Sequence, residues 1–192
     1  MMKDQIIKQS IQLFESKGFS ETSIQDIADA LGATKGTFYY YFPSKEQLLM
    51  DIHSTYIDDL LRRQQDILDA RDKDCKTKLF DMVGLTLKQI APNGRKAKIF
   101  FREMINLKEE NQRVIKGKRK AFRFNLQKIV EQGIENGEFN KDIRPDMATF
   151  AILGMCNWSY NWFDPSGPVS EEQLTETYSE MLLAGIVKKG DS

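Results

Sequence analysis

The chain has 192 residues, of which 41% are hydrophobic and 29% charged, with 28 Lys and Arg against 28 Asp and Glu. This length accommodates one domain or two small ones, and the composition excludes a disordered chain. A net charge of zero excludes a diffuse positive field, so any affinity for DNA must come from a few placed contacts and from two copies in a dimer.

The first 46 residues form a compact head in which helical periodicity is clear and strand patterns are nearly absent. Gly18 is placed to end the first helix, and Thr34 precedes the third. Thr22 or Ser23 caps the second helix, and Thr22 with Gln25 has the spacing of a capping box. The predicted helices of the head are 3–17, 24–31 and 35–42.

A body of long helices follows the head. The first begins after Pro43, where Ser44 and Gln47 match a capping box, and Ser170 with Gln173 caps the last. The sequence therefore predicts an all-α fold of about nine helices, with domains 1–46 and 47–192. The helices predicted between the two caps are about 44–70, 74–91, 95–107, 109–136 and 146–163.

The helix predicted over 146–163 carries too many apolar side chains for a single stripe, so it must be covered on several sides. The last helix covers part of it with a stripe of apolar and small residues. The rest of the apolar surface of this helix faces the chain's own core, or it faces a partner subunit, a pocket, or both a subunit and a pocket. The residues of the expected stripe are Leu174, Tyr178, Met181, Leu182 and Gly185.

The cysteines and the apolar segments indicate the cellular compartment of the protein. Cys75 and Cys156 form no ligand cluster, which favours packed thiols in a reducing compartment. The start of the chain lacks the apolar core of a signal peptide, and polar residues interrupt the longest apolar stretch, 148–163. We expect a cytoplasmic protein without membrane contact.

The helix predicted over 35–42 has two different faces at about 100° per residue. Phe38 and Phe42 fall together and should pack against the first two helices. Tyr40 falls on the opposite face beside Gly36, where it would stabilise nothing in the head. Such a surface suits close approach to DNA and hydrogen bonds to phosphates, although a tyrosine-rich packing edge is the alternative.

The head resembles the N-terminal domain of TetR-family transcriptional regulators over about residues 4–50. The matching segments are Gly18-Phe19, TSIQDIA at 22–28 and LGATKGTFYYYFPSKEQL at 31–48. The resemblance implies homodimers that bind palindromic operators in double-stranded DNA through a helix-turn-helix. It implies DNA contacts from Thr22, Ser23, Thr34, Lys35, Gly36, Thr37, Tyr39, Tyr40, Tyr41 and Lys45, with Tyr41 either reading a base or packing.

The same resemblance implies that the last two helices form a four-helix bundle across a twofold axis, with a ligand pocket among the middle helices. The tail segments GMCNW (154–158), WFDP (162–165) and GPVS (167–170) resemble TetR regulators that respond to acyl-coenzyme A thioesters. Twelve Lys and Arg against three Glu over 95–128 suit a polyphosphate ligand, or equally a solvated helix face. The expected ligand contacts are Phe100, Arg102, Met104, Trp158 and Trp162.

Other chemistry has little support. His53 is the single histidine and is an ordinary side chain rather than a metal ligand, and Glu109-Glu110 lacks spacing for acid–base work. We expect no catalytic residue, metal or cofactor. The sequence indicates a repressor whose ligand shifts the fourth helix and changes the spacing of the two heads. The rivals are an efflux regulator of the same fold and a helical binding module without DNA binding.

Overall fold

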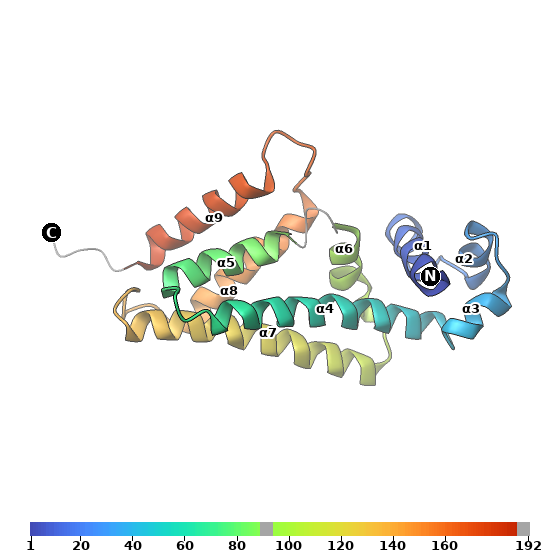
Figure 1. Cartoon of the computed structure of the whole chain (residues 1–192), viewed down its shortest axis with the longest axis horizontal. Coiled ribbons are helices and arrows are strands. Elements are labelled where there is room, and N and C mark those ends of the chain that lie inside the picture. The colour runs from blue at the N-terminus through green and yellow to red at the C-terminus, as the bar shows by residue number, and fades with distance from the viewer. Residues whose placement is uncertain (89–93, 188–192) are drawn as a thin grey trace. The chain divides into compact units, whose positions relative to one another are not determined.

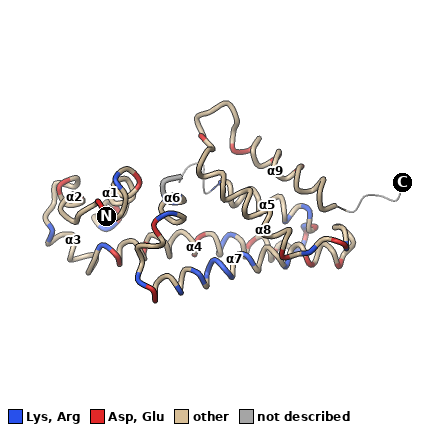
Figure 2. The backbone as a smooth tube through the Cα atoms, turned by 180° about the vertical axis from the view of Figure 1, so that it is seen from behind, with Lys and Arg blue, Asp and Glu red and all other residues tan. Residues whose placement is uncertain are grey.

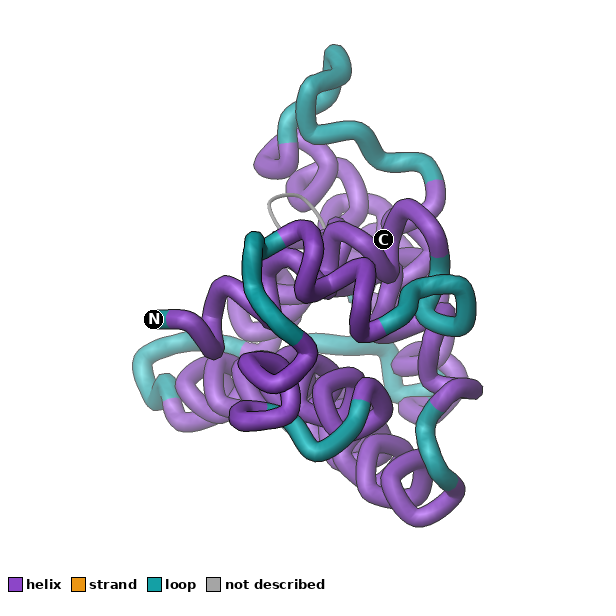
Figure 3. Tube along the Cα trace, turned by 90° about the vertical axis from the view of Figure 1, so that its right-hand side faces the viewer, coloured by secondary structure: helices purple, strands orange, loops and turns teal. Residues whose placement is uncertain are grey.

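The computed structural model describes residues 1–88 and 94–187. Within these residues the chain forms nine α-helices, and apart from one isolated bridge it has no extended pairing, which confirms the all-α prediction (Figures 1 and 3). The helices are α1 Met2–Lys17, α2 Ile24–Ala30, α3 Lys35–Tyr41, α4 Lys45–Asp69, α5 Cys75–Lys88, α6 Gly94–Arg102, α7 Glu109–Glu135, α8 Pro145–Trp158 and α9 Glu171–Ile186, with 3-10 helices η1 Glu103–Asn106 and η2 Ser159–Asn161.

Two predicted helices are shorter than expected because each closes in a tighter turn. The helix predicted over 95–107 ends at Arg102 and continues as η1, and the helix predicted over 146–163 ends at Trp158 and continues as η2. Residues 89–91 of the helix predicted over 74–91 lie outside the described residues.

The chain divides into two compact units, and the division is not a single cut near residue 46. Unit 1 contains Met1–Asp58 together with Asn93–Gly117, and unit 2 contains Asp59–Pro92 together with Lys118–Ser192. A segment far along the chain therefore belongs with the head.

Unit 1 is built around α1, which packs against α2 and α6, while α2 packs against α3. Polar contacts fasten the later segment to the head. Glu46 at the start of α4 accepts hydrogen bonds from the Lys108 backbone N–H at 3.0 Å and from Asn111 Nδ2 at 2.8 Å. Lys98 on α6 pairs with Glu15 on α1 at 3.4 Å. These bonds hold α6, η1 and the start of α7 against the helix-turn-helix.

Unit 2 has α5 at its centre, packed against both α8 and α9. Gln64 on α4 is one of the fully buried polar side chains of this unit's core. Gln64 Nε2 donates to the Phe122 carbonyl oxygen of α7 at 2.9 Å, and Gln64 Oε1 accepts from Asn125 Nδ2 at 2.9 Å. A buried amide with both ends satisfied fixes the register of α4 against α7.

The expected stripe on α9 is largely wrong. The side chains that α9 buries are Leu174, Thr175, Ser179 and Ile186. Of the predicted stripe only Leu174 is buried, and Met181 is 62% exposed. Short polar side chains face α5 because the helices approach closely: a Cβ on Gly84 of α5 would lie 3.4 Å from Thr175 Cγ2. Tyr178 and Leu182 are therefore only half-buried, and Met181 is exposed.

The end of α7 is closed by a tight contact between Gly133 and the ring of Phe139. The Gly133 carbonyl oxygen accepts from the backbone N–H groups of Glu138 and Phe139 at 2.8 and 2.9 Å, which turns the chain back onto the helix. The Phe139 ring, 1% exposed, then lies over Gly133, where an added Cβ would meet ring carbons at 2.3 Å. Only glycine fits at this position without moving a buried ring.

We expect Gly133→Ala to lower the free energy of unfolding by about 2 kcal/mol, because overpacking exceeds the gain in helix propensity. Gly117→Ala in the same helix is the control. A Cβ there meets nothing within 4 Å, so this variant should gain up to about 1 kcal/mol. Urea unfolding followed by circular dichroism measures both. Equal gains in unfolding free energy for the two variants would contradict the tight contact between Gly133 and Phe139.

Candidate nucleic-acid interface

The start of α2 is fixed by a capping box that differs from the expected one. The Ser23 hydroxyl oxygen accepts from the Asp26 backbone N–H at 3.0 Å, and the Ser23 backbone N–H donates to the Asp26 carboxylate at 2.7 Å. The bonds that the Asp26 carboxylate accepts, first from the Ser23 backbone N–H and then from the Ser23 hydroxyl, lower the pKa of the Asp26 carboxyl. The cap is Ser23 with Asp26, not Thr22 with Gln25. The spacing Ser-x-x-Asp at 23–26 is the sequence signal that predicts this cap.

A glycine-centred turn joins α2 to α3. Gly32 has φ +60°, which favours glycine, and the Ala33 backbone N–H donates to the Ala28 carbonyl oxygen at 2.9 Å. Thr34 then caps α3, its hydroxyl oxygen accepting from the Thr37 backbone N–H at 3.3 Å. The two threonine hydroxyls lie 3.2 Å apart. The sequence thus determines both the turn and the first residue of the second helix.

The faces of α3 are as predicted. Phe38 and Phe42 are buried, with ring centroids 5.9 Å apart, and hold the helix in the head. Tyr40 is 82% exposed and Tyr39 52% exposed, whereas Tyr41 is half-buried with its ring 4.9 Å from that of Tyr40. The helix therefore presents exposed tyrosine side chains that contribute little to the stability of the head.

Glycine at position 36 is not required by the fold of this unit. Gly36 is exposed, and a Cβ there would touch only the Thr34 hydroxyl oxygen at 3.4 Å, an ordinary contact. Its φ is not in the left-handed region. The missing side chain leaves the backbone of α3 accessible from outside, together with exposed Lys35 and half-exposed Thr37.

Two of the residues expected to contact phosphate are engaged within the head. Thr22 is fully buried, and its hydroxyl donates to the Gly18 carbonyl oxygen at 2.7 Å. The Ser23 hydroxyl donates to the Asp26 carboxylate at 2.7 Å, so the start of α2 already holds an anionic group. We remove Thr22 from the expected contact set, because a side chain without exposed area cannot reach a ligand.

Lys45, the third engaged residue, fastens α4 to the turn between α1 and α2. Its ammonium donates to the carbonyl oxygens of Phe19 at 2.6 Å, Ser20 at 3.4 Å and Thr22, and lies 4.4 Å from the centroid of the Phe19 ring. Burial lowers the pKa of Lys45, against the opposing effect of Glu21 and Asp26. Its three bonds are structural, so phosphate binding by Lys45 would require breaking them.

We expect Lys45→Met to destabilise unit 1 by about 1–2 kcal/mol, because hydrogen bonds from a charged donor are lost in a half-exposed setting. Lys35→Met is the matched control. Lys35 is exposed at the first position of α3, so its replacement should leave the unfolding free energy within about 0.5 kcal/mol. Urea titrations compare the two variants. An unchanged midpoint for Lys45→Met would show that these carbonyl bonds contribute nothing.

The residues expected to bind a small ligand do not share one environment. Phe100 is 3% exposed and belongs to the core of unit 1, with its ring centroid 4.6 Å from that of Tyr56 and 5.4 Å from that of His53. Arg102 is exposed and Met104 half-buried in the same unit; Trp158 and Trp162 in unit 2 are 66% and 50% exposed. The two tryptophans are surface residues in this chain rather than the lining of an enclosed pocket.

His53, Cys75 and Cys156 are the buried histidine and cysteines of the described residues. His53 is fully buried, with Nδ1 2.9 Å from the Leu49 carbonyl oxygen. Burial raises the pKa of Cys75 to about 11 and that of Cys156 to about 12, so both thiols are protonated at neutral pH. Over residues 1–88 and 94–187, no three His, Cys, Asp or Glu side chains gather as metal ligands. None of the described helices has the length and apolar character to cross a membrane.

Two short helices joined at a glycine, with an exposed face on the second and a buried face behind it, define a helix-turn-helix DNA-binding protein. The family "Bacterial regulatory proteins, tetR family" matches residues 6–52, and "Tetracyclin repressor-like, C-terminal domain" matches residues 72–186. The chain belongs to the tetR family and is a transcriptional regulator.

Relatives align along nearly the whole chain. The transcriptional repressor KstR2 of Mycolicibacterium smegmatis is 28% identical over 98% of this chain and 93% of its own. The structure of KstR2 of Mycobacterium tuberculosis, a ketosteroid transcriptional regulator, superposes with a TM-score of 0.91 at 25% identity, covering 98% and 96%. AibR, in complex with isovaleryl coenzyme A and operator DNA, superposes with a TM-score of 0.84 at 25% identity, covering 95% and 98%.

Proposed function

We propose that the protein is a homodimeric repressor that binds a palindromic operator through α3 and is released by an acyl-coenzyme A thioester. The observation that carries DNA binding is the exposed face of α3, where a largely exposed Tyr40 adjoins a glycine that the fold does not require. The repressor function of KstR2 and the operator complex of AibR support it. The proposal assigns the chain to regulation rather than to catalysis.

The proposed DNA surface is smaller than the set expected from sequence. Thr22 is removed, and Ser23 and Lys45 are reassigned to holding the head together. The tyrosine hydroxyls can donate to phosphate oxygens, and Lys35 adds the positive charge of this surface. The residues retained are Thr34, Lys35, Gly36, Thr37, Tyr39, Tyr40 and Tyr41.

We expect Tyr40→Ala to weaken operator binding about tenfold or more while the unfolding free energy changes by less than about 0.5 kcal/mol. Fluorescence anisotropy with the DNA upstream of the chain's own coding sequence, at two salt concentrations, measures the affinity. Phe80→Ala removes a partly exposed aromatic ring from unit 2 and should leave DNA affinity unchanged. A large loss of helix in Tyr40→Ala would instead make this residue part of the core.

A subunit interface accounts for the uncovered apolar side chains of unit 2. On α8, Met147, Phe150 and Trp158 are 49%, 51% and 66% exposed and lie at helical spacing. Met181 on α9 is 62% exposed and has Gly185 one turn further along. Exposed apolar side chains on both helices suit a subunit interface. Trp158 and Trp162 are therefore assigned to subunit contact rather than to ligand binding.

We expect Met181→Glu to convert the dimer into monomers, because it buries a charge without a partner in an apolar interface. Gln132→Glu, which adds the same charge to an exposed position on α7, should leave the dimer intact. Light scattering behind size-exclusion chromatography measures the mass of both variants. A monomeric wild-type chain at micromolar concentration would remove the dimer from the proposal.

The ligand class rests on the basic character of α7 (Figure 2). Lys118, Arg119, Lys120, Arg123 and Lys128 follow one another on this helix. The Arg123 guanidinium lies 4.3 Å from the Phe124 ring centroid, so a cation and an aromatic ring share one surface of α7. Phosphates of a coenzyme A moiety suit the cations, and its acyl chain suits apolar surface.

Release requires that the ligand bind the non-operator conformation better than the operator-bound one. A 100-fold preference corresponds to about 2.7 kcal/mol of coupling. Isovaleryl coenzyme A should raise the melting temperature of the free protein and lower operator affinity, whereas coenzyme A without an acyl group should do less. If neither compound changes the operator affinity, the acyl-coenzyme A assignment fails while DNA binding through α3 stands.

A further inference from the structure

A groove of about 410 Å³ opens on unit 2 between the end of α4, the middle of α5 and the first turns of α9. None of the five residues expected to bind a small ligand lines it. Its apolar surface comes from Ile67, Phe80 and Leu85. The volume lies in the range of small-molecule sites, and Phe80 is 39% exposed although it faces this hollow.

The charges around the groove do not balance. Asp81 is matched by Lys73, with Nζ 2.7 Å from Oδ2, and Arg63 Nε lies 2.8 Å from Asp59 Oδ2. Carboxylates from Glu171, Glu172 and Glu176 on the α9 side then face Lys88, the remaining cation of the lining. The wall formed by α9 is therefore anionic.

Two further observations concern the polar groups that line the groove. Thr175 lines the groove and is only 6% exposed, and among the described residues its hydroxyl has no hydrogen-bond partner. Burial raises the pKa of Glu171 even though Lys88 opposes the shift, so its carboxylate is poorly solvated. A carboxylate that burial leaves poorly solvated is stabilised by a positively charged guest.

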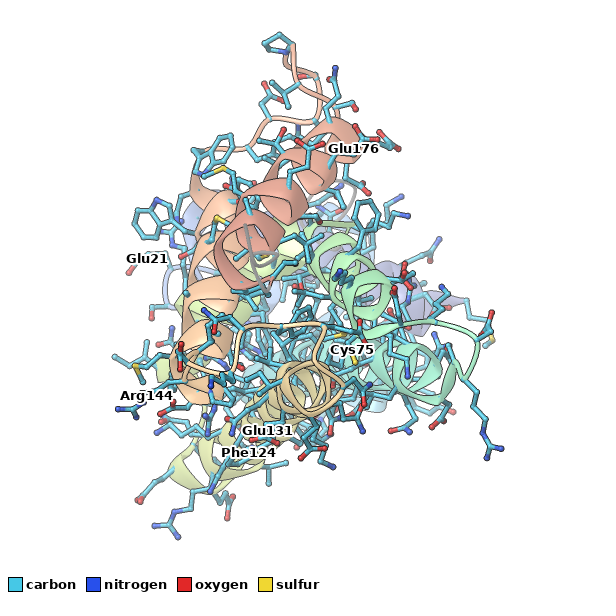
Figure 4. All side chains as sticks on the ribbon, turned by 90° about the vertical axis from the view of Figure 1, so that its left-hand side faces the viewer. Glu21, Cys75, Phe124, Glu131, Arg144 and Glu176 are labelled. Atoms are coloured by element: carbon cyan, nitrogen blue, oxygen red, sulfur yellow. The ribbon has the colours of Figure 1, made fainter. Side chains whose placement is uncertain are left out.

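We propose that this groove binds an organic cation with an apolar body, its charge against the α9 carboxylates and its body against Phe80 and Leu85. A cation over or beside an aromatic ring gains further attraction. Glu176, labelled on α9 in Figure 4, is one of the carboxylates that line the site. The site is separate from acyl-coenzyme A binding and does not depend on it.

The charge and position of the groove argue against other occupants. An acyl-coenzyme A carries anionic phosphates, which the α9 wall repels. A second copy of the chain would use the apolar side of α9. At about 100° per residue, Met181 lies about 140° around the helix from Glu176 and about 120° from Thr175, so the groove opens away from that side.

Tetraphenylphosphonium and tetraphenylborate have the same shape and opposite charge, and they form a matched pair of probes. Isothermal titration calorimetry with the full chain should show tetraphenylphosphonium binding at least about tenfold more tightly than tetraphenylborate at moderate salt. Equal affinity would mean that apolar surface alone attracts both ions, and would overturn the proposal. Displacement of tetraphenylphosphonium by isovaleryl coenzyme A would assign the groove to the effector site and overturn its separateness.

Variants locate the binding. The double variant Glu172→Gln with Glu176→Gln should weaken tetraphenylphosphonium binding about tenfold, and Phe80→Ala about fivefold. Glu180→Gln, on the same helix but absent from the groove lining, is the control and should bind as the wild type does. Unchanged affinity in both groove variants would overturn the proposal. A change in molecular mass in the double variant would identify the groove as a subunit contact instead.

Discussion

The ammonium of Lys45 is the contact on which the geometry of the head depends. Three backbone carbonyl oxygens between α1 and α2 accept hydrogen bonds from it. Because Lys45 is also the first residue of α4, these bonds fasten the start of that long helix to the turn. At the other end, Gln64 fixes α4 to α7. A single helix is thus bonded at one end in unit 1 and at the other end in unit 2.

Sequence predicted most of the head because its determinants are local. The glycine at 32, the cap at Thr34 and the alternation of Phe38 with Tyr40 each act within a few residues. The backbone bonds of Lys45 were not predicted, for the opposite reason. Its partners lie 23 to 26 residues away, and a lysine near a DNA-binding helix looks the same in sequence whether it binds phosphate or backbone.

The body was predicted well in its helices and poorly in its faces. Periodicity shows that α9 is amphipathic but not which flank meets α5, and here close approach at Gly84 selects Thr175 over Met181 for the inner face. Likewise, a run of aromatic residues on α8 indicates covered surface without saying what covers it. The attachment of α6, η1 and the start of α7 to unit 1 depends on contacts between residues far apart in the sequence, 62 positions for Glu46 and Lys108, which no local pattern encodes.

The closure of α7 by Phe139 has a consequence for communication within the proposed dimer. Next to this ring, the Asn140 backbone N–H donates to the Ile186 carbonyl oxygen at 2.8 Å. Phe139 and Val187 form an isolated antiparallel β-bridge. The end of α9 is therefore fastened to the end of α7. A ligand that displaces α7 must also strain the helix proposed to meet the second subunit. Occupancy in one protomer would then alter the affinity of the other, and effector titrations would be cooperative rather than independent.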